Sequence, residues 1–365
     1  MPWGSFGLIT TAGLAERPAR SASEGHAEHA SHAGEALRPV GKTCQERYGV
    51  VGNWPQTTFW TLIPLGPPPG KIGSHKRACD RGYRSLAPRA IPRLPVPRST
   101  ACAILRVVSF SDVAGNLRES FRAIAASRGP GEIRELGGVS IAAAGVTFQM
   151  FNAAFLSTPV FSEAELTQRI LLPSVHFGAR GMEWAYWVCE DWLEGKARRR
   201  SRQVFERYGL RHSVDLPGMV AECVAPPVKP LPRIEVRRVR DAAARDAFCG
   251  IGSACFHVPF LWFQEVFDSE SVWERFAGYV GYVDGEPVST AATVIGCGAI
   301  GVYNVATLPE SQRLGYGEAV MRHALADARR EHGIERSVLQ STPAGYKLYE
   351  RMGYRTVTRV AVYAA

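Results

Sequence analysis

The sequence predicts a mixed α/β (α+β) fold, in which a mostly antiparallel, twisted sheet is flanked by helices and the arrangement is present twice. Two observations predict the sheet and its helices. Asp284-Gly285 separates two strand-like runs, which is a strong hairpin signal, and residues 299–333 read as strand, glycine-rich loop and helix. A third observation predicts the duplication: FERYGL at 205–210 resembles YERMGY at 349–354, 144 positions later (349 minus 205).

Length and composition limit the class of protein. The 365 residues, 46% of them hydrophobic and 21% charged, are enough for two domains. No apolar run reaches the roughly 18 residues of a membrane-spanning helix, so we expect no membrane partner. The eight cysteines are scattered without a C-x-x-C pair. This pattern argues against a zinc knuckle or a disulfide framework and predicts a reducing, cytoplasmic location.

Residues 1–106 differ from the rest and are predicted to be a disordered or mis-annotated N-terminal extension. Residues 1–100 hold 13 Lys/Arg and 6 Asp/Glu, so seven of the nine net positive charges lie there. Residues 1–105 hold 12 of the 24 prolines. The alternatives to a disordered tail are a transit peptide and translation from an upstream start codon chosen in error. Peptides from residues 50–95 in a mass spectrum of the native protein would contradict the latter.

Two further features of this extension have a simple interpretation. His26, His29 and His32 stand in an Ala/Ser/Glu-rich patch, and we expect a solvated polar segment there rather than a metal site. The residues after position 100 carry only two net positive charges (nine minus seven). We therefore expect no nucleic-acid partner, since such a function would depend on the tail alone.

Residues 107–225 are predicted to form a first, degenerate copy of the fold. Strands are expected at 138–145, 147–151 and 183–192. Ser162 and Glu165 make a capping box that opens a helix, and a second helix spans 196–208 and ends at Gly209. The arginines of this second helix, Arg198, Arg199, Arg200 and Arg202, are expected to form a solvated face rather than a phosphate site. Residues 226–232 (PPVKPLP) form a stiff linker.

Residues 233–365 carry a more complete pattern. Strands are expected at 234–239, 276–283, 287–295, from 299, at 336–340 and over 354–363. Helices are expected over 241–267, split near Pro259, then after the glycine loop, and after Ser341 or Thr342 with Pro343 at the first helical position. Gly250-Ile251-Gly252 has no strand before it and is interpreted as a loop. The order β-α-α-β-β-β-α-β-α-β contains one parallel crossover, through the helix that follows the glycine loop.

The glycine loop has a chemical interpretation of its own. Gln312-Arg313-Leu314-Gly315-Tyr316-Gly317 lies between the end of a strand and the start of a helix. Free backbone N–H groups and the positive end of the helix dipole favour an anion at such a place. Glycines also let the main chain approach a phosphate closely. The structural alternative is a tight turn before a core helix.

From about Ile234 to its end, the chain resembles the GNAT superfamily of acyl-CoA-dependent N-acyltransferases. Gln312–Gly317 matches that family's [QR]-x-x-G-x-[GA] motif, and Leu348–Tyr354 matches its L-Y-x-x-x-G-[FY] motif. The motifs stand in the family's order, about 36 residues apart (349 minus 313). Residues 107–225 resemble a degenerate copy, as in tandem GNAT proteins, because Phe205 replaces the tyrosine and the glycine loop is missing.

The resemblance implies a co-substrate, a binding site for it and a catalytic residue. Acetyl-CoA or a related acyl-CoA is the implied co-substrate, and no metal is expected. Its pyrophosphate is implied to bind the loop and its pantetheine arm the strand edge, through Val305, Ala306, Thr307, Gln312, Arg313, Leu314, Gly315, Tyr316, Gly317 and Glu318. Tyr349 is implied to protonate the leaving thiolate; a core aromatic is the structural alternative.

The chain departs from the family at two points. Thr342 stands where many members have an asparagine, and the strand before the loop offers Tyr303 and Asn304 rather than a carboxylate. Glu265, Asp268, Glu274 and His257 are candidate substitutes for the general base, although such residues more often serve as surface charges or packing groups. Water is the remaining choice.

We therefore expect an acyltransferase that moves an acetyl or similar acyl group from acyl-CoA to an amine, with catalysis confined to residues 233–365. The amine is expected to belong to a small molecule, and the protein to be a monomer or homodimer. A protein N-acetyltransferase and a non-catalytic acyl-CoA-binding regulatory module are the alternatives. Five tryptophans are candidates for an acceptor cleft between the halves or for the core: Trp184, Trp187, Trp192, Trp262 and Trp273.

Overall fold

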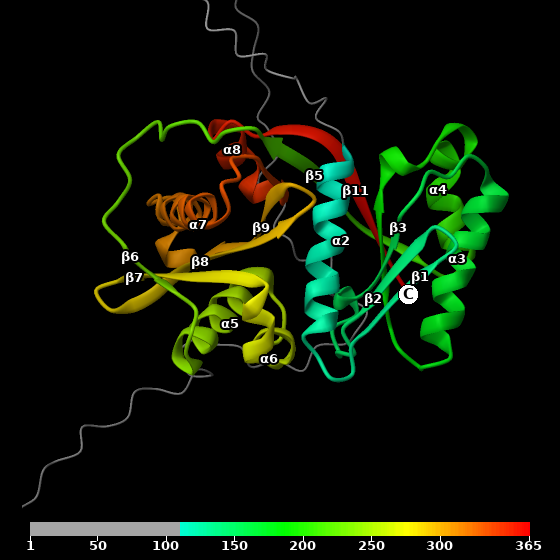
Figure 1. Cartoon of the computed structure of the whole chain (residues 1–365), viewed down its shortest axis with the longest axis horizontal. Coiled ribbons are helices and arrows are strands. Elements are labelled where there is room, and N and C mark those ends of the chain that lie inside the picture. Colours follow the sequence, from blue (N-terminus) through cyan, green and yellow to red (C-terminus); the bar gives the residue numbers. More distant parts are fainter. Residues whose placement is uncertain (1–109) are drawn as a thin grey trace, which may run out of the picture. The chain divides into compact units, whose positions relative to one another are not determined.

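The structure is a computed structural model that describes residues 110–365, and these residues form one eleven-stranded sheet with helices packed against it (Figure 1). Along the sheet the strands follow the order β1-β2-β3-β4-β11-β5-β10-β9-β8-β7-β6. Within it, β3–β4 and β9–β10 pair in parallel, while the other neighbours are antiparallel. The mixed, mostly antiparallel sheet that the sequence predicts is confirmed.

The N-terminal half opens with a helix that no sequence pattern had indicated. Its elements are α2 Phe110–Ala126, β1 Glu132–Leu136, β2 Val139–Ala143, η1 Gln149–Phe151, β3 Asn152–Leu156, α3 Glu163–Gly178, β4 Ala185–Cys189, η2 Glu190–Trp192, α4 Gly195–Arg207 and β5 Arg211–Ala221. The predicted capping box starts α3: Ser162 accepts from the Glu165 N–H at 3.1 Å, and the Glu165 carboxylate accepts from the Phe161 N–H at 2.9 Å.

The C-terminal half follows the predicted element order. Its elements are β6 Glu235–Arg238, α5 Ala242–Phe256, α6 Phe260–Phe267, η3 Glu270–Glu274, β7 Phe276–Val283, β8 Glu286–Gly296, β9 Ala299–Thr307, η4 Pro309–Ser311, α7 Tyr316–His332, β10 Ser337–Gln340, α8 Pro343–Arg351 and β11 Arg355–Ala364. Asp284 and Gly285 join β7 to β8 with φ of 50° and 83°. Two consecutive positive φ angles match the right-handed twist of the flanking strands, which explains the hairpin signal.

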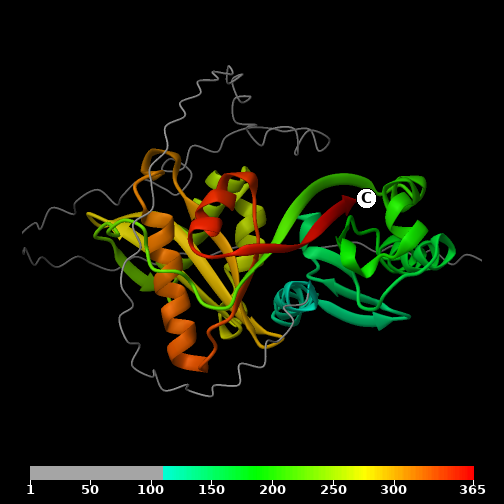
Figure 2. The ribbon, with the colours of Figure 1, turned by 90° about the horizontal axis from the view of Figure 1, so that it is seen from above.

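The last strands of the two halves are exchanged. β5 pairs with β10 on one side and with β11 on the other, while β11 also pairs with β4. Figure 2 shows β5 and β11 running side by side between the halves. If β1–β5 are matched one by one with β7–β11, the strands follow the same order inward from β1 and inward from β7. The exception is that β5 and β11 have changed places. The duplication of one ancestral unit, and the boundaries at 225 and 233, remain our predictions.

Helices cover both faces of the sheet in each half. In the C-terminal half, Tyr279 and Ala291 pack with α7, whereas their neighbours Val280 and Ala292 pack with α5 and α6, so these helices lie on opposite faces (Figure 1). This alternation is the period of two expected of a strand buried on both sides. In the N-terminal half, α2 covers one face and α3 and α4 the other. Helix α2 also contacts β8, β9 and β10, and so joins the two halves.

Three local predictions are wrong. Gly250–Gly252 lies inside α5 rather than in a loop. The glycine serves close packing there, since a Cβ on Gly252 would lie 2.5 Å from the Phe263 ring of α6. Residues 147–151 are a loop and a 3₁₀ turn, because Asn152 accepts from Gly145 N–H at 3.0 Å and donates to the Val146 carbonyl at 2.8 Å, which folds the segment on itself. The strand predicted over 183–192 ends at Cys189 and continues as η2.

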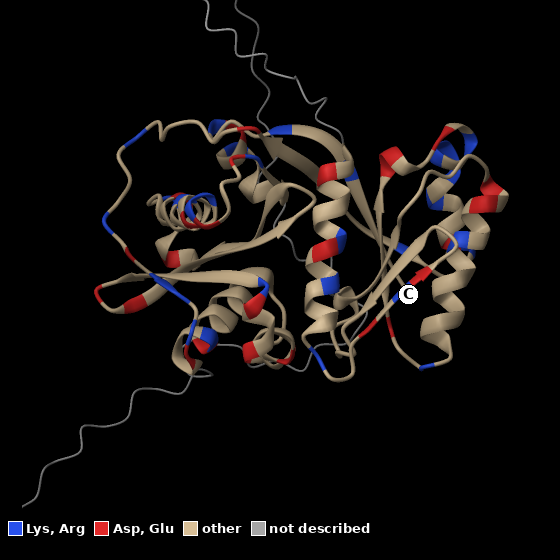
Figure 3. Cartoon of the chain, in the orientation of Figure 1, with Lys and Arg blue, Asp and Glu red and all other residues tan. Residues whose placement is uncertain are grey.

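The arginines of α4 are exposed, as predicted for a solvated face. Arg200 pairs with Glu163 at 3.3 Å and Arg202 with Glu206 at 3.0 Å. Figure 3 shows basic and acidic residues interspersed on and around this helix. The run is therefore balanced by nearby acids, and its phosphate-site alternative has no structural support.

Several predictions fall on residues 1–109, which lie outside the described part of the chain. They concern the N-terminal extension with its three histidines, and the alternatives of a transit peptide and of a nucleic-acid-binding tail. Among the residues that are described, none of the helices combines the length and the apolar character that crossing a membrane requires.

Candidate functional site

The two parallel strands β9 and β10 separate soon after they meet. Within the described chain they pair only through Ile300 and Gly301 with Ser337 and Val338, so the rest of β9 has an edge free of strand partners. In the N-terminal half the equivalent gap is closed. Val160 and Leu193 form a bridge there, and the Val160 N–H donates to the Trp192 carbonyl at 2.8 Å. Only the C-terminal half thus presents an open strand edge at this position.

A bulge shapes that edge. The register between β8 and β9 shifts between the pairs Thr290–Ala306 and Ala292–Tyr303, and Asn304 has a φ of 49°. The extra residue turns the following main chain. Val305, Ala306 and Thr307 therefore lie along the opening, where they line the cavity described below.

The glycine loop closes the end of this opening. Gly315 is the N-cap of α7 with φ of 90°, no side chain caps the helix, and Arg313 also has a positive φ of 64°. The Gln312 side chain donates to the Thr307 carbonyl at 3.0 Å and ties the loop to the end of β9. The N–H groups of the first turn have no partner inside their own helix, so the loop presents donors and a positive dipole end to an anion.

Gly315 and Gly317 are each required for a different structural reason. Gly315 adopts a left-handed conformation that side chains disfavour. A Cβ on Gly317 would lie 2.9 Å from the Thr307 hydroxyl oxygen, which is too close. Glu318 lies in the first turn but is ion-paired with Arg322 at 2.8 Å. Its charge is thus balanced, and the loop remains suited to a phosphate.

Tyr349 lies on α8 and lines the same cavity as the loop. It is 8% exposed, and its ring packs edge-on against Tyr354 with centroids 6.0 Å apart. Burial raises the pKa of Tyr349 to about 12. The phenol is therefore protonated at neutral pH and available as a proton donor. Thr342 caps α8, as one of the two predicted alternatives had it, by accepting from the Gly345 N–H at 3.4 Å.

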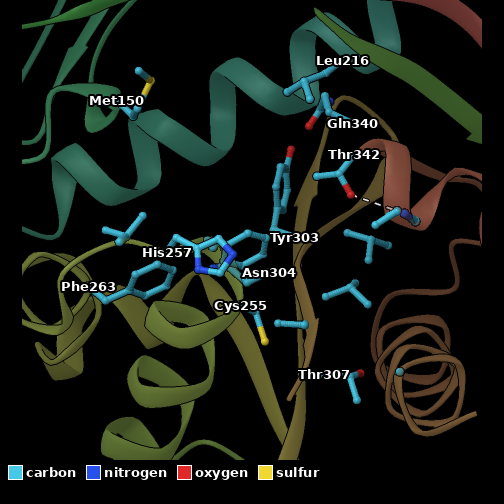
Figure 4. A pocket seen from close by; sticks show the side chains of 18 of the residues that line it. Met150, Leu216, Cys255, His257, Phe263, Tyr303, Asn304, Thr307, Gln340 and Thr342 are labelled. Carbon is cyan, nitrogen blue, oxygen red and sulfur yellow. Dashed lines mark hydrogen bonds between the residues drawn. The ribbon is translucent and has the colours of Figure 1, made fainter. Parts of the chain in front are cut away.

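A single cavity of about 1930 Å³ joins these parts and extends between the halves of the described chain. In Figure 4, Thr307 marks the end at the glycine loop, while Met150 and Leu216 mark the opposite end; Tyr303, Asn304 and His257 lie between them. The far end is contributed mainly by the N-terminal half, through Leu117, Phe121, Phe148, Met150, Phe151, Trp187 and Leu216. The N-terminal half thus shapes the site without supplying a second glycine loop.

Tyr303 is held in place by a residue that sequence reasoning missed. Its hydroxyl donates to Asn116 Oδ1 at 2.6 Å, and Asn116, fully buried on α2, donates to the carbonyls of Val294, Gly296 and Ala299 at 3.3, 3.0 and 3.1 Å. Burial raises the pKa of Tyr303. Asn116 and Tyr303 are 187 positions apart, and no local motif marks the pair.

The candidate bases divide into two groups. His257 and Glu265 line the cavity, while Asp268 and Glu274 are not among the residues that do. The Glu265 carboxylate accepts from the Thr147 N–H at 2.8 Å and thus connects the halves. Asp268 instead faces Arg245 at 3.6 Å. Of the four, His257 lies beside Asn304 in the middle of the cavity (Figure 4).

The five candidate tryptophans are likewise divided. Trp187 and Trp262 line the cavity. Trp184 stacks on Phe177 in the core of the N-terminal half, Trp192 packs edge-on against Phe110, and Trp273 packs against Phe248. Three of the five therefore pack in the core, and two lie on the cavity wall; the acceptor cleft remains a prediction.

The described residues fit a coenzyme A thioester better than a metal. The uncapped helix start, the left-handed Gly315 and the free edge of β9 suit a pyrophosphate followed by an amide-bearing arm. Arg313 makes no ion pair within residues 110–365 and lies on the cavity wall. Among these same residues, no group of three or more His, Cys, Asp or Glu side chains is arranged to hold a metal ion.

Comparison with known proteins agrees with this geometry. Residues 272–356 match the family model described as an acetyltransferase (GNAT) domain. The fold is similar to that of a GCN5-related N-acetyltransferase from Kribbella flavida, with a TM-score of 0.54 and 19% identity over 69% of this chain and 95% of that one. A putative GNAT-family acetyltransferase from Novosphingobium aromaticivorans aligns at a TM-score of 0.44 and 14% identity, over 69% and 97% of the two chains. No curated protein matches the sequence.

The matched residues contain the glycine loop, both separated strands and the helix that carries Tyr349. The region that the chemistry of the loop singles out is thus the region that the family model matches. We conclude that residues 272–356 form a GNAT acetyltransferase domain, within a chain whose fold is similar to that of a GCN5-related N-acetyltransferase.

Proposed function

We propose that the protein transfers an acetyl group from acetyl-CoA to the amine of a small molecule, using one active site in the C-terminal half. The observation that carries the proposal is the continuous cavity, which runs from the glycine loop past Tyr349 to a far end walled by the N-terminal half. A walled cavity suits a whole small molecule, whereas a protein substrate needs a groove open along a peptide.

The proposed binding of acetyl-CoA divides between main-chain and side-chain groups. The N–H groups of Arg313 to Glu318 would hold the pyrophosphate at the start of α7. Val305, Ala306 and Thr307 would pair with the pantetheine arm, as an added strand would. The Gln312 side chain contributes by holding the loop against Thr307. The cofactor supplies the activated acyl group; the protein supplies its orientation.

The proposed chemistry is direct transfer. The amine nitrogen forms a C–N bond to the thioester carbonyl carbon as the C–S bond breaks. Tyr349 donates a proton to the leaving sulfur, and the nitrogen releases one proton to water or to a base. Among the candidate bases, His257 is the side chain best placed within the cavity. Asp268 and Glu274 do not reach the cavity wall and are left out of the proposal.

Catalysis in the C-terminal half alone is supported by the closed gap of the other half. There the Val160–Leu193 bridge occupies the place of the open edge, and α3 begins with a side-chain cap rather than a glycine. A cytoplasmic location and a monomeric or homodimeric state belong to the same proposal. The location rests on the scattered cysteines.

The test is coenzyme A release from acetyl-CoA with a panel of amines, followed with a thiol reagent, and mass spectrometry of the products. We expect release that depends on a small amine and yields its N-acetyl derivative. Binding of acetyl-CoA without amine-dependent release would favour the non-catalytic alternative. Transfer to peptides in preference to every small amine would favour a protein substrate.

A further inference from the structure

The far end of the cavity, beyond Tyr303, is lined by different residues from the end at the glycine loop. The whole cavity measures about 1930 Å³, while pockets for single small ligands usually measure roughly 300 to 1,000 Å³. The glycine loop and the edge of β9 account for one end. The far end, lined by residues of η1, α6 and β4, is left for a second molecule.

Aromatic rings form the walls of this end. Phe148, just before η1, stacks on Trp262 of α6 with centroids 5.4 Å apart and planes at 27°. Trp187 of β4 packs on Phe121 of α2 at 5.1 Å. All four residues line the cavity and come from elements of both halves. Such walls select a flat apolar group, because aromatic rings gain energy from offset or edge-on contacts beyond the area they bury.

Two polar atoms at this site have no partner within the described chain. Gln149 Oε1 and Gln340 Nε2 are both buried from solvent, and both residues line the cavity. A buried polar atom without a partner destabilises the fold. A ligand that carries a hydrogen-bonding group would offset that destabilisation. Both groups are neutral, so they select for a neutral polar substituent rather than for charge.

The carboxylates that line the cavity either bond to other groups of the protein or lie at its edge. The Glu265 carboxylate accepts from the Thr147 N–H at 2.8 Å, and that of Glu318 pairs with Arg322 at 2.8 Å. Glu183 is exposed at the rim. A polyamine or a multiply charged sugar amine needs several desolvated carboxylates. The interior therefore suits an amine with a single basic nitrogen.

Resting on the proposed acetyltransferase function, we infer that the acceptor is an arylalkylamine, whose ring lies between the stacked Phe148–Trp262 pair and Trp187. Its amine would point toward Tyr303 and Asn304 on β9, where the acyl group arrives. The reaction is R–NH₂ plus acetyl-CoA to R–NH–acetyl plus coenzyme A. The glutamine side chains would contact a ring substituent.

Direct binding tests this inference separately from turnover. Tryptophan fluorescence of the full chain is titrated with 2-phenylethylamine, and in parallel with spermidine, in the presence of coenzyme A. We expect saturable binding of 2-phenylethylamine and about tenfold weaker binding or none for spermidine. Phe148→Ala should weaken 2-phenylethylamine binding about tenfold, and the milder Trp262→Phe a few-fold. Phe161→Ala, at a 62% exposed position, is the matched control and should bind as the wild type does.

The polar contacts have their own pair of variants. Gln149→Leu should weaken binding of tyramine, which has a ring hydroxyl, more than that of 2-phenylethylamine. Gln203→Leu, on the exposed face of α4, should leave both unchanged.

Three results would overturn the inference while leaving acetyl transfer intact. The first is tighter binding of spermidine than of 2-phenylethylamine. The second is unchanged binding in both Phe148→Ala and Trp262→Phe. The third is a preference for octanoyl-CoA over acetyl-CoA that Phe148→Ala abolishes, because the aromatic end would then hold the acyl chain. Absence of amine-dependent coenzyme A release would instead contradict the proposed function, since the binding titration does not depend on turnover.

Discussion

Replacing Tyr349 by phenylalanine removes one hydroxyl from the cavity wall and little else. No hydrogen bond to this hydroxyl is recorded among residues 110–365, so its loss leaves no buried partner unsatisfied. The ring, 8% exposed, keeps its contact with Tyr354. We therefore expect the free energy of unfolding to change by less than about 0.5 kcal/mol, and the affinity for acetyl-CoA to be nearly unchanged.

Turnover should respond differently. Positioned proton transfer usually contributes about 10²- to 10⁴-fold to a rate. Because burial raises the pKa of Tyr349 to about 12, this phenol is a weaker acid than usual, and we expect the lower end. Tyr349→Phe should reduce kcat by roughly tenfold to a hundredfold, which corresponds to about 1.4 to 2.7 kcal/mol in the activation free energy.

The matched control is Tyr354→Phe. Tyr354 is also buried, but its hydroxyl bonds to Ser337 Oγ at 2.6 Å and does not line the cavity. This variant should lose about 1 kcal/mol of stability and keep its kcat. The assay is steady-state coenzyme A release, with urea unfolding for stability. Equal kcat in Tyr349→Phe and wild type would remove Tyr349 from the mechanism.

The pH dependence gives a second check on Tyr349. A donor is active in its protonated form, which is lost as pH rises through its pKa. With a pKa of about 12, the contribution of Tyr349 to kcat should persist from pH 7 to 10. A fall in kcat between pH 8 and 10 that disappears in Tyr349→Phe would contradict the burial argument.

Three other predictions test the glycine loop, the hydrogen bonds of Asn116 and the cavity residue Cys255. Gly315→Glu should abolish acetyl-CoA binding, measured by calorimetry, through strain at φ of 90° and charge at the anion site. Gly333→Glu, with φ of 66° and open space at the other end of α7, should lose stability and still bind. Asn116→Leu should lower the unfolding free energy by roughly 2 to 4 kcal/mol, because it leaves several buried carbonyls without their donor. A loss within about 0.5 kcal/mol would be inconsistent with these hydrogen bonds. Burial raises the pKa of Cys255 to about 11, so its alkylation, followed by peptide mass spectrometry, should accelerate as pH rises from 7 toward 11. Bound acetyl-CoA should slow this alkylation, because the Cys255 thiol lies beside Thr307 (Figure 4), and alkylation that cofactor does not slow would argue against that binding mode.

Local sequence patterns were sufficient to predict most of the helices and strands of the C-terminal half. The Asp284-Gly285 turn and the cap predicted at Ser341 or Thr342 each act within a few residues. The structure has the turn where it was predicted and the cap at Thr342. The errors occurred where side-chain contacts decide. Gly252 allows Phe263 to pack closely against α5, so this glycine does not mark a loop. Residues 147–151 are not a strand because the Asn152 side chain bonds the main chain of Gly145 and Val146.

What the sequence determined by itself is the part of the site made from contiguous residues. The glycine loop, the strand edge at Val305–Thr307 and the helix of Tyr349 lie within one stretch. Backbone geometry gives the first two their chemistry, and a single side chain gives the third its own. Only the tertiary structure decided the acceptor end. Asn116 reaches Tyr303 from 187 positions away, and Phe148 meets Trp262 across the two halves. Such contacts follow from the exchange of β5 and β11 in one sheet, which no local periodicity can encode, because strand partners are chosen by packing over the whole chain.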